Sequence, residues 1–251
     1  MKKFIVFLFC VMLAMVLAGC GGTAKEKTAE KVLKVATDAN FPPYEYYQEK
    51  TKAHTGFDIG IMNALAKEMG YTKVEYVNVD FKNLLAGLSK KEYDAVIAGL
   101  TISPERQQKV TFTDSYIKGS YRIVVAKNAA DKCPLEGKIV AAESGSYAGD
   151  LAMQNKAGKL LPVNDVEGAL QAVSEGKAQC AVLSSVAAKF FIAHGYGDKV
   201  KFADEKELLA DEMGIAVAKD NAALAKEFNK ALAELRRSGE YKKIYSSYFG
   251  A

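Results

Sequence analysis

A glycine, a threonine and an arginine near the end of one apolar segment combine the groups that bind a carboxylate. Residues 93–100 (YDAVIAGL) form a continuous apolar run typical of buried parallel strands, and Gly99, Thr101 and Arg106 lie at its end or just beyond it. A guanidinium matches both oxygens of a carboxylate, a threonine adds a hydroxyl, and a glycine allows close approach of the backbone. Open parallel sheets bind ligands beyond the carboxyl ends of their strands, so this is a candidate anion site.

The same residues have a second interpretation. Ser103-Pro104-Glu105 is typical of a helix start, with a serine cap and a proline in the first turn. Arg106 would then lie in that first turn, with its guanidinium in solvent. From these residues alone, the helix start is the favoured interpretation.

Two acidic residues also follow predicted strands. Asp38 follows residues 32–37 (VLKVAT), and Glu143 follows residues 138–142 (KIVAA). The Asp38 carboxylate, at the end of the first strand, is expected to face the same candidate site. For Glu143, a solvated loop position is the equal alternative to a place in that site. Residues in the glycine-containing turn after Glu143 present hydroxyl groups, and the N–H groups of such a turn can cradle an oxyanion. These residues are Ser144, Ser146 and Tyr147.

Composition and motifs exclude several other kinds of protein. The chain has 251 residues, 49% of them hydrophobic and 25% charged, with a formal charge of +4, which is ordinary globular usage. Charges of both signs are scattered, so we expect no nucleic-acid partner. The four cysteines lack CxxC spacing, the two histidines lack nearby catalytic partners, and no GxSxG, HExxH or Walker pattern occurs. We expect no metal, no cofactor and no catalytic residue.

Strands and helices alternate along the first half of the chain. Predicted strands cover residues 32–37, 74–79 and 93–100, and predicted helices cover 57–69 and 81–89. In the first of these helices, Asp58 is expected to act as the cap and Gly70 to end it.

A second alternating series begins at Tyr121. Predicted strands cover 121–126, 138–142, 178–183 and 215–218, and helices cover 166–174, 221–237 and, after Gly239, 241–249. Two such series predict an α/β protein with mostly parallel sheets and two lobes.

The N-terminus has the features of an export signal. Two lysines precede residues 4–18, an uncharged apolar run of 15 residues that is short for a membrane-spanning helix. We therefore predict a signal peptide over residues 1–19. The sequence Leu17-Ala18-Gly19-Cys20 resembles the bacterial lipobox, which predicts lipidation of Cys20 with palmitate and a polar tether over residues 20–31.

Five segments in order resemble the polar amino-acid-binding proteins of ABC importers, solute-binding protein family 3. They are ATDANFPPYEY (36–46), GFDIGIMNALAKEMG (56–70), DAVIAGLTISPERQQKVTFTDSY (94–116), LEGKIVAAESGS (135–146) and LAELRRSGEYKKIYSSYFG (232–250). The resemblance covers essentially the whole chain after the signal peptide.

The resemblance implies a two-lobed periplasmic-binding-protein-like fold of type II, with two crossover strands as its hinge. The first lobe is expected over residues 32–116 plus 213–251, and the second over 121–208. The expected hinges are 116–120 and 209–213. The ligand is expected in the cleft between the lobes.

The resemblance also assigns ligand-binding positions. Arg106, with Ala98, Gly99 and Thr101, matches the family positions for the ligand α-carboxylate, and Phe41 and Phe81 match rings that sandwich the ligand. Ser184 stands where relatives often carry an aspartate for the α-amino group. Because a serine does not neutralise an ammonium, Glu143 is expected to replace that charge or to bind a cationic side chain.

The function that follows is a lipid-anchored, extracytoplasmic receptor at the cell membrane. It is expected to be a monomer that delivers an amino acid or similar small zwitterion, with basic amino acids among the candidates, to the permease of an ABC importer. Two alternatives remain: an enzyme on the same fold, similar to cyclohexadienyl dehydratases, and a sensor that binds solute without transport.

Overall fold

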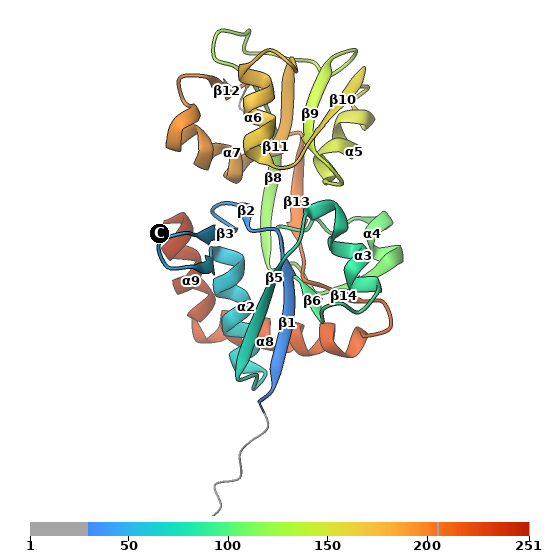
Figure 1. Ribbon diagram of the computed structural model, residues 1–251, viewed down its shortest axis with the longest axis vertical. Coiled ribbons are helices and arrows are strands. Elements are labelled where there is room, and N and C mark those ends of the chain that lie inside the picture. Colours follow the sequence, from blue (N-terminus) through green and yellow to red (C-terminus); the bar gives the residue numbers. More distant parts are fainter. Residues whose placement is uncertain (1–29, 205, 251) are drawn as a thin grey trace, which may run out of the picture. The chain divides into compact units, whose positions relative to one another are not determined.

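The structure, a computed structural model, describes residues 30–204 and 206–250. They form two α/β lobes (Figure 1), which confirms the predicted fold class. The signal peptide and Cys20 lie outside the described residues.

The first lobe is built on a five-stranded sheet with the order β5-β1-β6-β14-β7. Strand β1 is parallel to β5 and β6, whereas β14 is antiparallel to β6 and β7. The strands of this sheet are β1 (Val32–Thr37), β5 (Lys73–Asn78), β6 (Ala95–Val96), β7 (Val110–Phe112) and β14 (Ala216–Ala218). A small antiparallel sheet beside it contains β2 (Asn40–Phe41), β3 (Glu45–Gln48) and β4 (Ala53–Thr55).

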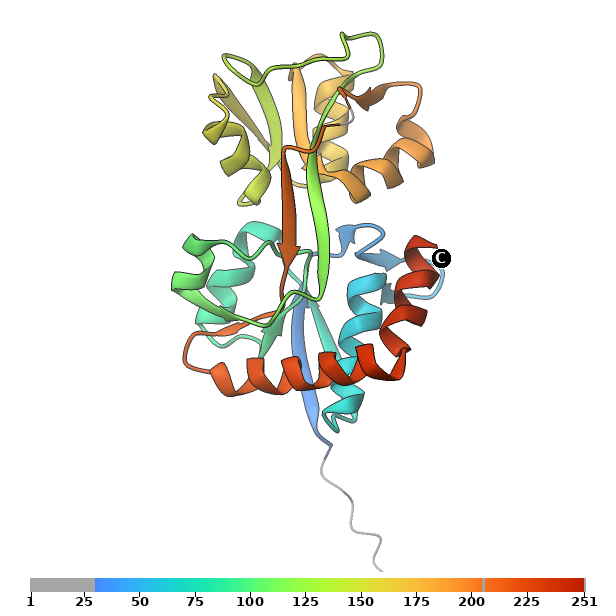
Figure 2. The same cartoon turned by 180° about the vertical axis from the view of Figure 1, so that it is seen from behind.

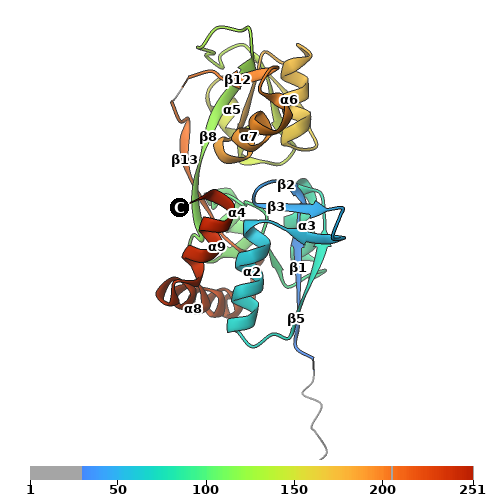
Figure 3. The ribbon, with the colours of Figure 1, turned by 90° about the vertical axis from the view of Figure 1, so that its left-hand side faces the viewer.

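Helices pack around these two sheets of the first lobe. They are α2 (Phe57–Glu68), the 3₁₀ turn η1 (Phe81–Asn83), α3 (Leu84–Ser89), α4 (Pro104–Lys109), α8 (Ala222–Ser238) and α9 (Glu240–Phe249). Figure 3 shows α2 and α9 side by side next to the small sheet, with α8 beneath them.

The second lobe is built on a sheet with the order β10-β9-β11-β8-β12, with β13 also paired to β8. Its strands are β8 (Ile117–Ala126), β9 (Ile139–Glu143), β10 (Lys159–Val163), β11 (Cys180–Ser184), β12 (Val200–Phe202) and β13 (Leu209–Met213). Its helices are α5 (Tyr147–Gln154), α6 (Val166–Ser174), α7 (Ser185–Phe191) and the π-helical turn η2 (Ile192–Tyr196). Strands β9, β10 and β11 are parallel, which places their carboxyl ends at one edge.

Two antiparallel strands join the lobes. Residues Ile117 to Tyr121 of β8 pair with Met213 to Leu209 of β13, and Figure 2 shows the two strands side by side between the lobes. The chain enters the second lobe on the first strand and returns on the other. These two strands overlap the expected hinges, residues 116–120 and 209–213.

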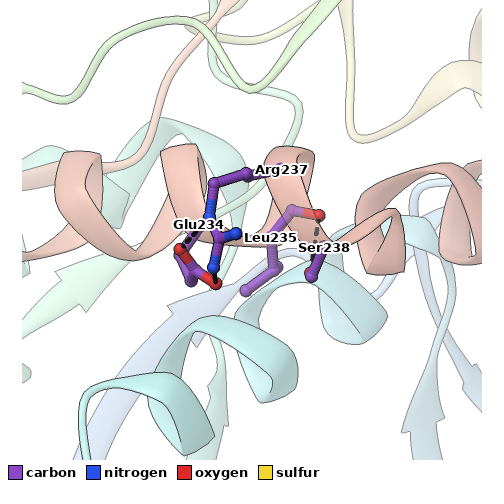
Figure 4. Close-up of polar contacts among 4 residues, drawn as sticks. All are labelled: Glu234, Leu235, Arg237 and Ser238. Carbon is purple, nitrogen blue, oxygen red and sulfur yellow. Dashed lines mark hydrogen bonds and ion pairs between the residues drawn. The ribbon is translucent and has the colours of Figure 1, made fainter.

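Helix α8 closes the core of the first lobe with one apolar face. Leu224, Phe228, Leu232 and Leu235 are buried at helical spacing against β1 and α2 residues such as Leu33 and Leu65. The opposite face is solvated: the Arg237 guanidinium donates two hydrogen bonds to the carboxylate of Glu234 (Figure 4). The helix ends at Gly239, whose φ of +81° is a left-handed conformation that suits glycine.

The expectation of mostly parallel sheets is wrong, because β8 is antiparallel to β11, β12 and β13, and β14 is antiparallel to β6 and β7. Two local predictions are wrong as well. Asp58 does not cap α2: the cap position is Gly56, and no side chain there accepts a helix N–H. The apolar run 93–100 forms only the two-residue strand β6, because its last residues leave the sheet and turn at Gly99, where φ is +52°.

Candidate functional site

A cleft between the lobes collects residues from strand ends and turns of both. Seven of the predicted site residues line it: Asp38, Phe41, Phe81, Gly99, Glu143, Ser146 and Ser184. The remaining lining residues are Tyr121 and the apolar side chains of Ala148, Val166, Val182 and Leu183. The wall from the second lobe is therefore largely apolar, with polar groups placed at a few positions, as in small-molecule sites.

Two carboxyl groups, one from each lobe, meet in this cleft. Asp38 follows β1, Glu143 ends β9, and both line the cleft. Burial is the largest cause that raises the pKa of Glu143 to about 8, followed by the charge of Asp38. Burial also raises the pKa of Asp38 to about 6, partly offset by a 3.0 Å hydrogen bond from the Phe81 N–H. At neutral pH, Glu143 is therefore mostly protonated and Asp38 mostly ionised.

A third carboxylate adds to this negative potential. Asp165 precedes α6 as its cap and accepts a 2.7 Å hydrogen bond from the N–H of Gly168. Its charge raises the pKa of both Asp38 and Glu143. The carboxylates at these strand ends together favour a cation between them.

Arg106 lies at the border of the cleft and contacts both lobes. Its Nη1 donates a 2.9 Å hydrogen bond to the Thr101 carbonyl, and its Nη2 donates a 3.1 Å hydrogen bond to the Gly145 carbonyl in the second lobe. The guanidinium carbon lies 5.4 Å from the centre of the Phe81 ring. The Ser103 hydroxyl accepts from the Arg106 backbone N–H, so a capped helix start and a cleft-facing guanidinium coexist here.

Two rings define the first-lobe side of the cleft. Phe41 stacks on Tyr44 with ring centres 5.1 Å apart, and a Cβ atom on Gly99 would lie 2.6 Å from the Phe41 ring. Glycine at position 99 is therefore required by both the close ring and the positive φ. Ala98, by contrast, is buried in the first-lobe core rather than in the cleft wall.

The turn after Glu143 uses most of its polar groups within the protein. The Ser144 N–H and hydroxyl both donate to the Val163 carbonyl, at 2.9 and 3.0 Å. The Ser146 N–H and hydroxyl both donate to the Glu143 carbonyl. Tyr147 packs against Tyr121, with ring centres 6.2 Å apart. These contacts fix the turn and occupy the N–H groups of Ser144 and Ser146 within the protein.

Ser184 ends β11 and faces the cleft without a satisfied hydroxyl. It is 5% exposed, and its Oγ has no hydrogen-bond partner among the described residues. The nearby Tyr44 hydroxyl interacts with it electrostatically but is likewise without a bond of normal geometry. A buried hydroxyl in this state is available to a ligand.

Sequence reasoning did not find a polar group of three residues at the hinge. The Thr101 hydroxyl lies 2.9 Å from the Tyr121 hydroxyl of β8 and donates a 3.2 Å hydrogen bond to Asp211 of β13. Burial raises the pKa of Asp211 to about 6. These residues are 110 positions apart at most, so only the strand pairing could reveal their contact.

Comparison with known proteins agrees with this geometry. Residues 33–251 match the family described as bacterial extracellular solute-binding proteins, family 3. This chain is a member of that family. The two-lobed fold and the cleft between the lobes are thus those of a family-3 solute-binding protein.

Relatives of this solute-binding protein cover nearly its whole length. The chain is 28% identical to the arginine-binding extracellular protein ArtP of Bacillus subtilis (strain 168), over 99% of this chain and 98% of that one. It is 30% identical to the histidine-binding periplasmic protein of Escherichia coli (strain K12), over 99% and 97%. A solved structure of an ancestral arginine-binding protein bound to arginine matches 88% of this chain and 99% of its own, with a TM-score of 0.81 and 32% identity.

The described part of this family-3 protein contains neither a candidate membrane-spanning helix nor a candidate metal-ligand group. No helix there has both the length and the apolar character needed to cross a bilayer. No group of three or more histidine, cysteine, aspartate or glutamate side chains there is arranged to hold a metal ion.

Proposed function

We propose that this solute-binding protein takes an L-amino acid with a cationic side chain, such as arginine, between its lobes. The observation that carries the proposal is the pair of carboxyl groups from opposite lobes, Asp38 and Glu143, which both line the cleft. A guanidinium or ammonium group placed between them would favour release of the Glu143 proton and pair with both. The arginine- and histidine-binding relatives support the same ligand class.

The opposite end of the ligand is assigned to the first lobe. The carbonyl oxygens of Thr101 and Gly145 accept hydrogen bonds from two N–H groups of the Arg106 guanidinium. Among the described residues, no other hydrogen bond from its remaining three N–H groups is found. A ligand carboxylate would bind there, with the Phe41 and Phe81 rings against the ligand's apolar carbons. The unsatisfied Ser184 hydroxyl is left to accept from the ligand α-amino group.

Calorimetry with a panel of amino acids tests the ligand class. L-arginine, L-lysine and L-histidine should bind at least about tenfold more tightly than L-glutamate, because the cleft is acidic where the side chain would lie. Glu143→Gln keeps the shape and removes the charge, so it should weaken arginine binding about tenfold or more. Ser184→Asp in that variant should partly restore the affinity.

A matched control and two outcomes complete this test. Glu136→Gln changes an exposed glutamate of the same lobe, 72% exposed and paired with Lys156, and should leave the arginine affinity unchanged. The proposal fails if an acidic amino acid is the best ligand, or if Glu143→Gln binds arginine as the wild type does.

We further propose that the protein is anchored by lipid on Cys20 and delivers its ligand to an ABC permease. The lipobox-like sequence and the family membership support this. Cys20→Ala should move the protein from the membrane fraction to the soluble fraction and reduce uptake of labelled arginine by cells. Unchanged membrane association of that variant would contradict the anchor.

A dehydratase-like enzyme is the second candidate, and one observation favours it. Glu143 is mostly protonated at neutral pH, with a pKa of about 8 that suits a general acid. We attribute this pKa to burial and the charge of Asp38, and we expect no turnover. Incubation with a cyclohexadienyl carboxylate should produce no aromatic product by ultraviolet absorbance, whereas product formation that Glu143→Gln abolishes would establish the enzyme.

A further inference from the structure

The first lobe buries a second pair of carboxyl groups, outside the cleft. Glu45 in β3 and Asp58 in α2 are both 0% exposed. Neither oxygen of Glu45, nor Oδ1 of Asp58, has a hydrogen-bond partner among the described residues. Burial, and then the charge of Asp58, raises the pKa of Glu45 well above its ordinary range. Burial therefore favours the protonated form of Glu45.

Asp58 uses its other oxygen to join two distant segments. Its Oδ2 accepts a 2.9 Å hydrogen bond from the Gly99 N–H and a 2.6 Å hydrogen bond from the Tyr116 hydroxyl. Gly99 lines the cleft, and Tyr116 immediately precedes β8, the first strand that crosses to the second lobe. The Tyr116 carbonyl in turn accepts a 2.7 Å hydrogen bond from Tyr241 of α9, which fixes this residue from a third side.

Two buried carboxyl groups are costlier in free energy than the packing of this core requires. Asp58 receives two hydrogen bonds, both from neutral donors, and the charges that affect its neighbour Glu45 are those of other acids, Asp38 and Glu143 among them. Burying a carboxylate is costly unless hydrogen bonds compensate, and an apolar side chain would fill the same space at lower cost. A helix cap does not explain it, since the side chain caps nothing.

We propose that Asp58 is a positioning residue for ligand binding: its carboxylate fixes the cleft loop at Gly99 to the hinge residue Tyr116. A shift of the hinge at Tyr116 would then move the loop at Gly99, which faces the ligand, although Asp58 itself touches neither ligand nor solvent. The ligand-affinity part of this inference rests on the proposed function, whereas the loop-to-hinge connection does not.

Hydrogen exchange in the ligand-free protein tests the connection directly. Asp58→Asn preserves the shape but leaves one weaker acceptor, so the Gly99 amide should exchange at least about tenfold faster. Tyr116→Phe removes only the hinge donor and should leave the Gly99 amide protected. Asp94→Asn is the matched control: Asp94 also accepts a backbone N–H of the same sheet, from Lys34, but away from the cleft, and it should leave the Gly99 amide protected.

Affinity for L-arginine provides the second readout. Asp58→Asn should weaken binding about tenfold or more, and Tyr116→Phe about threefold to tenfold, with melting temperatures that show both variants folded. The double variant should bind no worse than Asp58→Asn alone, because both changes break one connection. Asp94→Asn should bind within twofold of the wild type.

The outcomes separate this inference from the proposed function. If the wild type does not bind arginine, the ligand class is wrong and the exchange experiment alone judges Asp58. If Asp58→Asn leaves Gly99 protected, or both folded variants bind arginine like the wild type, Asp58 is only a core residue. If Asp58→Asn does not fold, Tyr116→Phe decides: an affinity within twofold of the wild type overturns the proposal.

Discussion

Arg106 connects the lobes through its own hydrogen bonds, to Thr101 in the first lobe and Gly145 in the second. The residue therefore has two tasks at once, because the same planar group is offered to a ligand carboxylate. A lysine would keep the charge but not the fork of donors. Substitutions of Arg106 and of the Asp38–Glu143 pair are therefore the ones expected to change the ligand affinity most.

Arg106→Ala should weaken arginine binding about 30-fold to several thousand-fold, which corresponds to roughly 2–5 kcal/mol for truncating one member of a buried charge pair. Arg106→Lys should lie between this variant and the wild type. Calorimetry is the measurement. Arg237→Ala, at a guanidinium of α8 that is 76% exposed, serves as the control and should change nothing. An Arg106→Ala loss below threefold would refute the carboxylate role.

Affinity for arginine should rise with pH. Glu143 has a pKa of about 8 in the ligand-free cleft, so it is mostly protonated at pH 7, and a ligand cation beside it favours ionisation. Binding then releases a proton, and the association constant should increase up to tenfold per unit between about pH 6 and about pH 8, then level off. Calorimetry in buffers of different ionisation enthalpy measures the released proton. The slope should be much smaller in Glu143→Gln; an equal slope there would contradict the assignment.

The raised pKa of Glu143 makes the stability of the folded protein depend on pH. Because the folded-state pKa lies above its ordinary value, the contribution of protonated Glu143 to the free energy of unfolding is fully present at acidic pH. It is lost as the pH rises through about 8. The same reasoning applies to Asp38 over a lower range, through about pH 6.

Among the elements, the entry to α2 is the most constrained. Gly56 has a φ of +122°, and a Cβ there would lie 2.2 Å from the Tyr44 carbonyl oxygen. This approach places β3 against the helix start, and with it the Glu45–Asp58 pair. Gly70, just after the other end of α2, also has a positive φ of +75° but has open space around it.

Gly56→Ala should therefore destabilise the protein by about 3 kcal/mol or more, since backbone strain and a steric clash add. Gly70→Ala should cost only about 1–2 kcal/mol, from the left-handed conformation alone. Chemical denaturation measures both. Equal losses for the two variants would show that the contact with Tyr44 carries no energy.

Most long elements could be predicted from the sequence, whereas side-chain roles often could not. Helix α6 begins and ends at the predicted residues, and α8 differs by one residue at each end, because strong periodicity and end signals define them. The short strands β2 to β4, and the segments α5 and β10, were not predicted because they lack a clear period. Asp58 was assigned to a cap because it stands near a helix start; its true partners, Gly99 and Tyr116, are 41 and 58 residues away.

The candidate site shows the same limit. Because Asp38 and Glu143 each stand at the end of a predicted strand, the sequence places them at the ligand-binding edge of their sheets. The structure shows both of them in the lining of the same cleft. The contacts of Thr101 with Tyr121 and Asp211 depend on the pairing of β8 with β13, which no local pattern encodes.

At the scale of the whole molecule, ligand contacts on both lobes should favour closure about the β8–β13 pair. A ligand shifts such an equilibrium only through its differential affinity for the two states, and bonds from both lobes exist only when the cleft is closed. Small-angle scattering should give a smaller radius of gyration with arginine than without it above about pH 8, where both carboxyl groups of the ligand-free cleft are mostly ionised and repel each other. An unchanged curve at saturation would count against closure.

The two crossings of the chain also determine the order in which the lobes can fold. The second lobe with its two crossing strands is one continuous stretch of chain, from β8 to β13. The first lobe needs β14 between β6 and β7, and four leucine and phenylalanine side chains of α8 in its core, all from the C-terminal part. A chain emerging N-terminus first can therefore complete its second lobe while the first still lacks its closing pieces. The first lobe's apolar sheet stays uncovered until the last helices arrive, so it is the part of a nascent chain that most needs a chaperone.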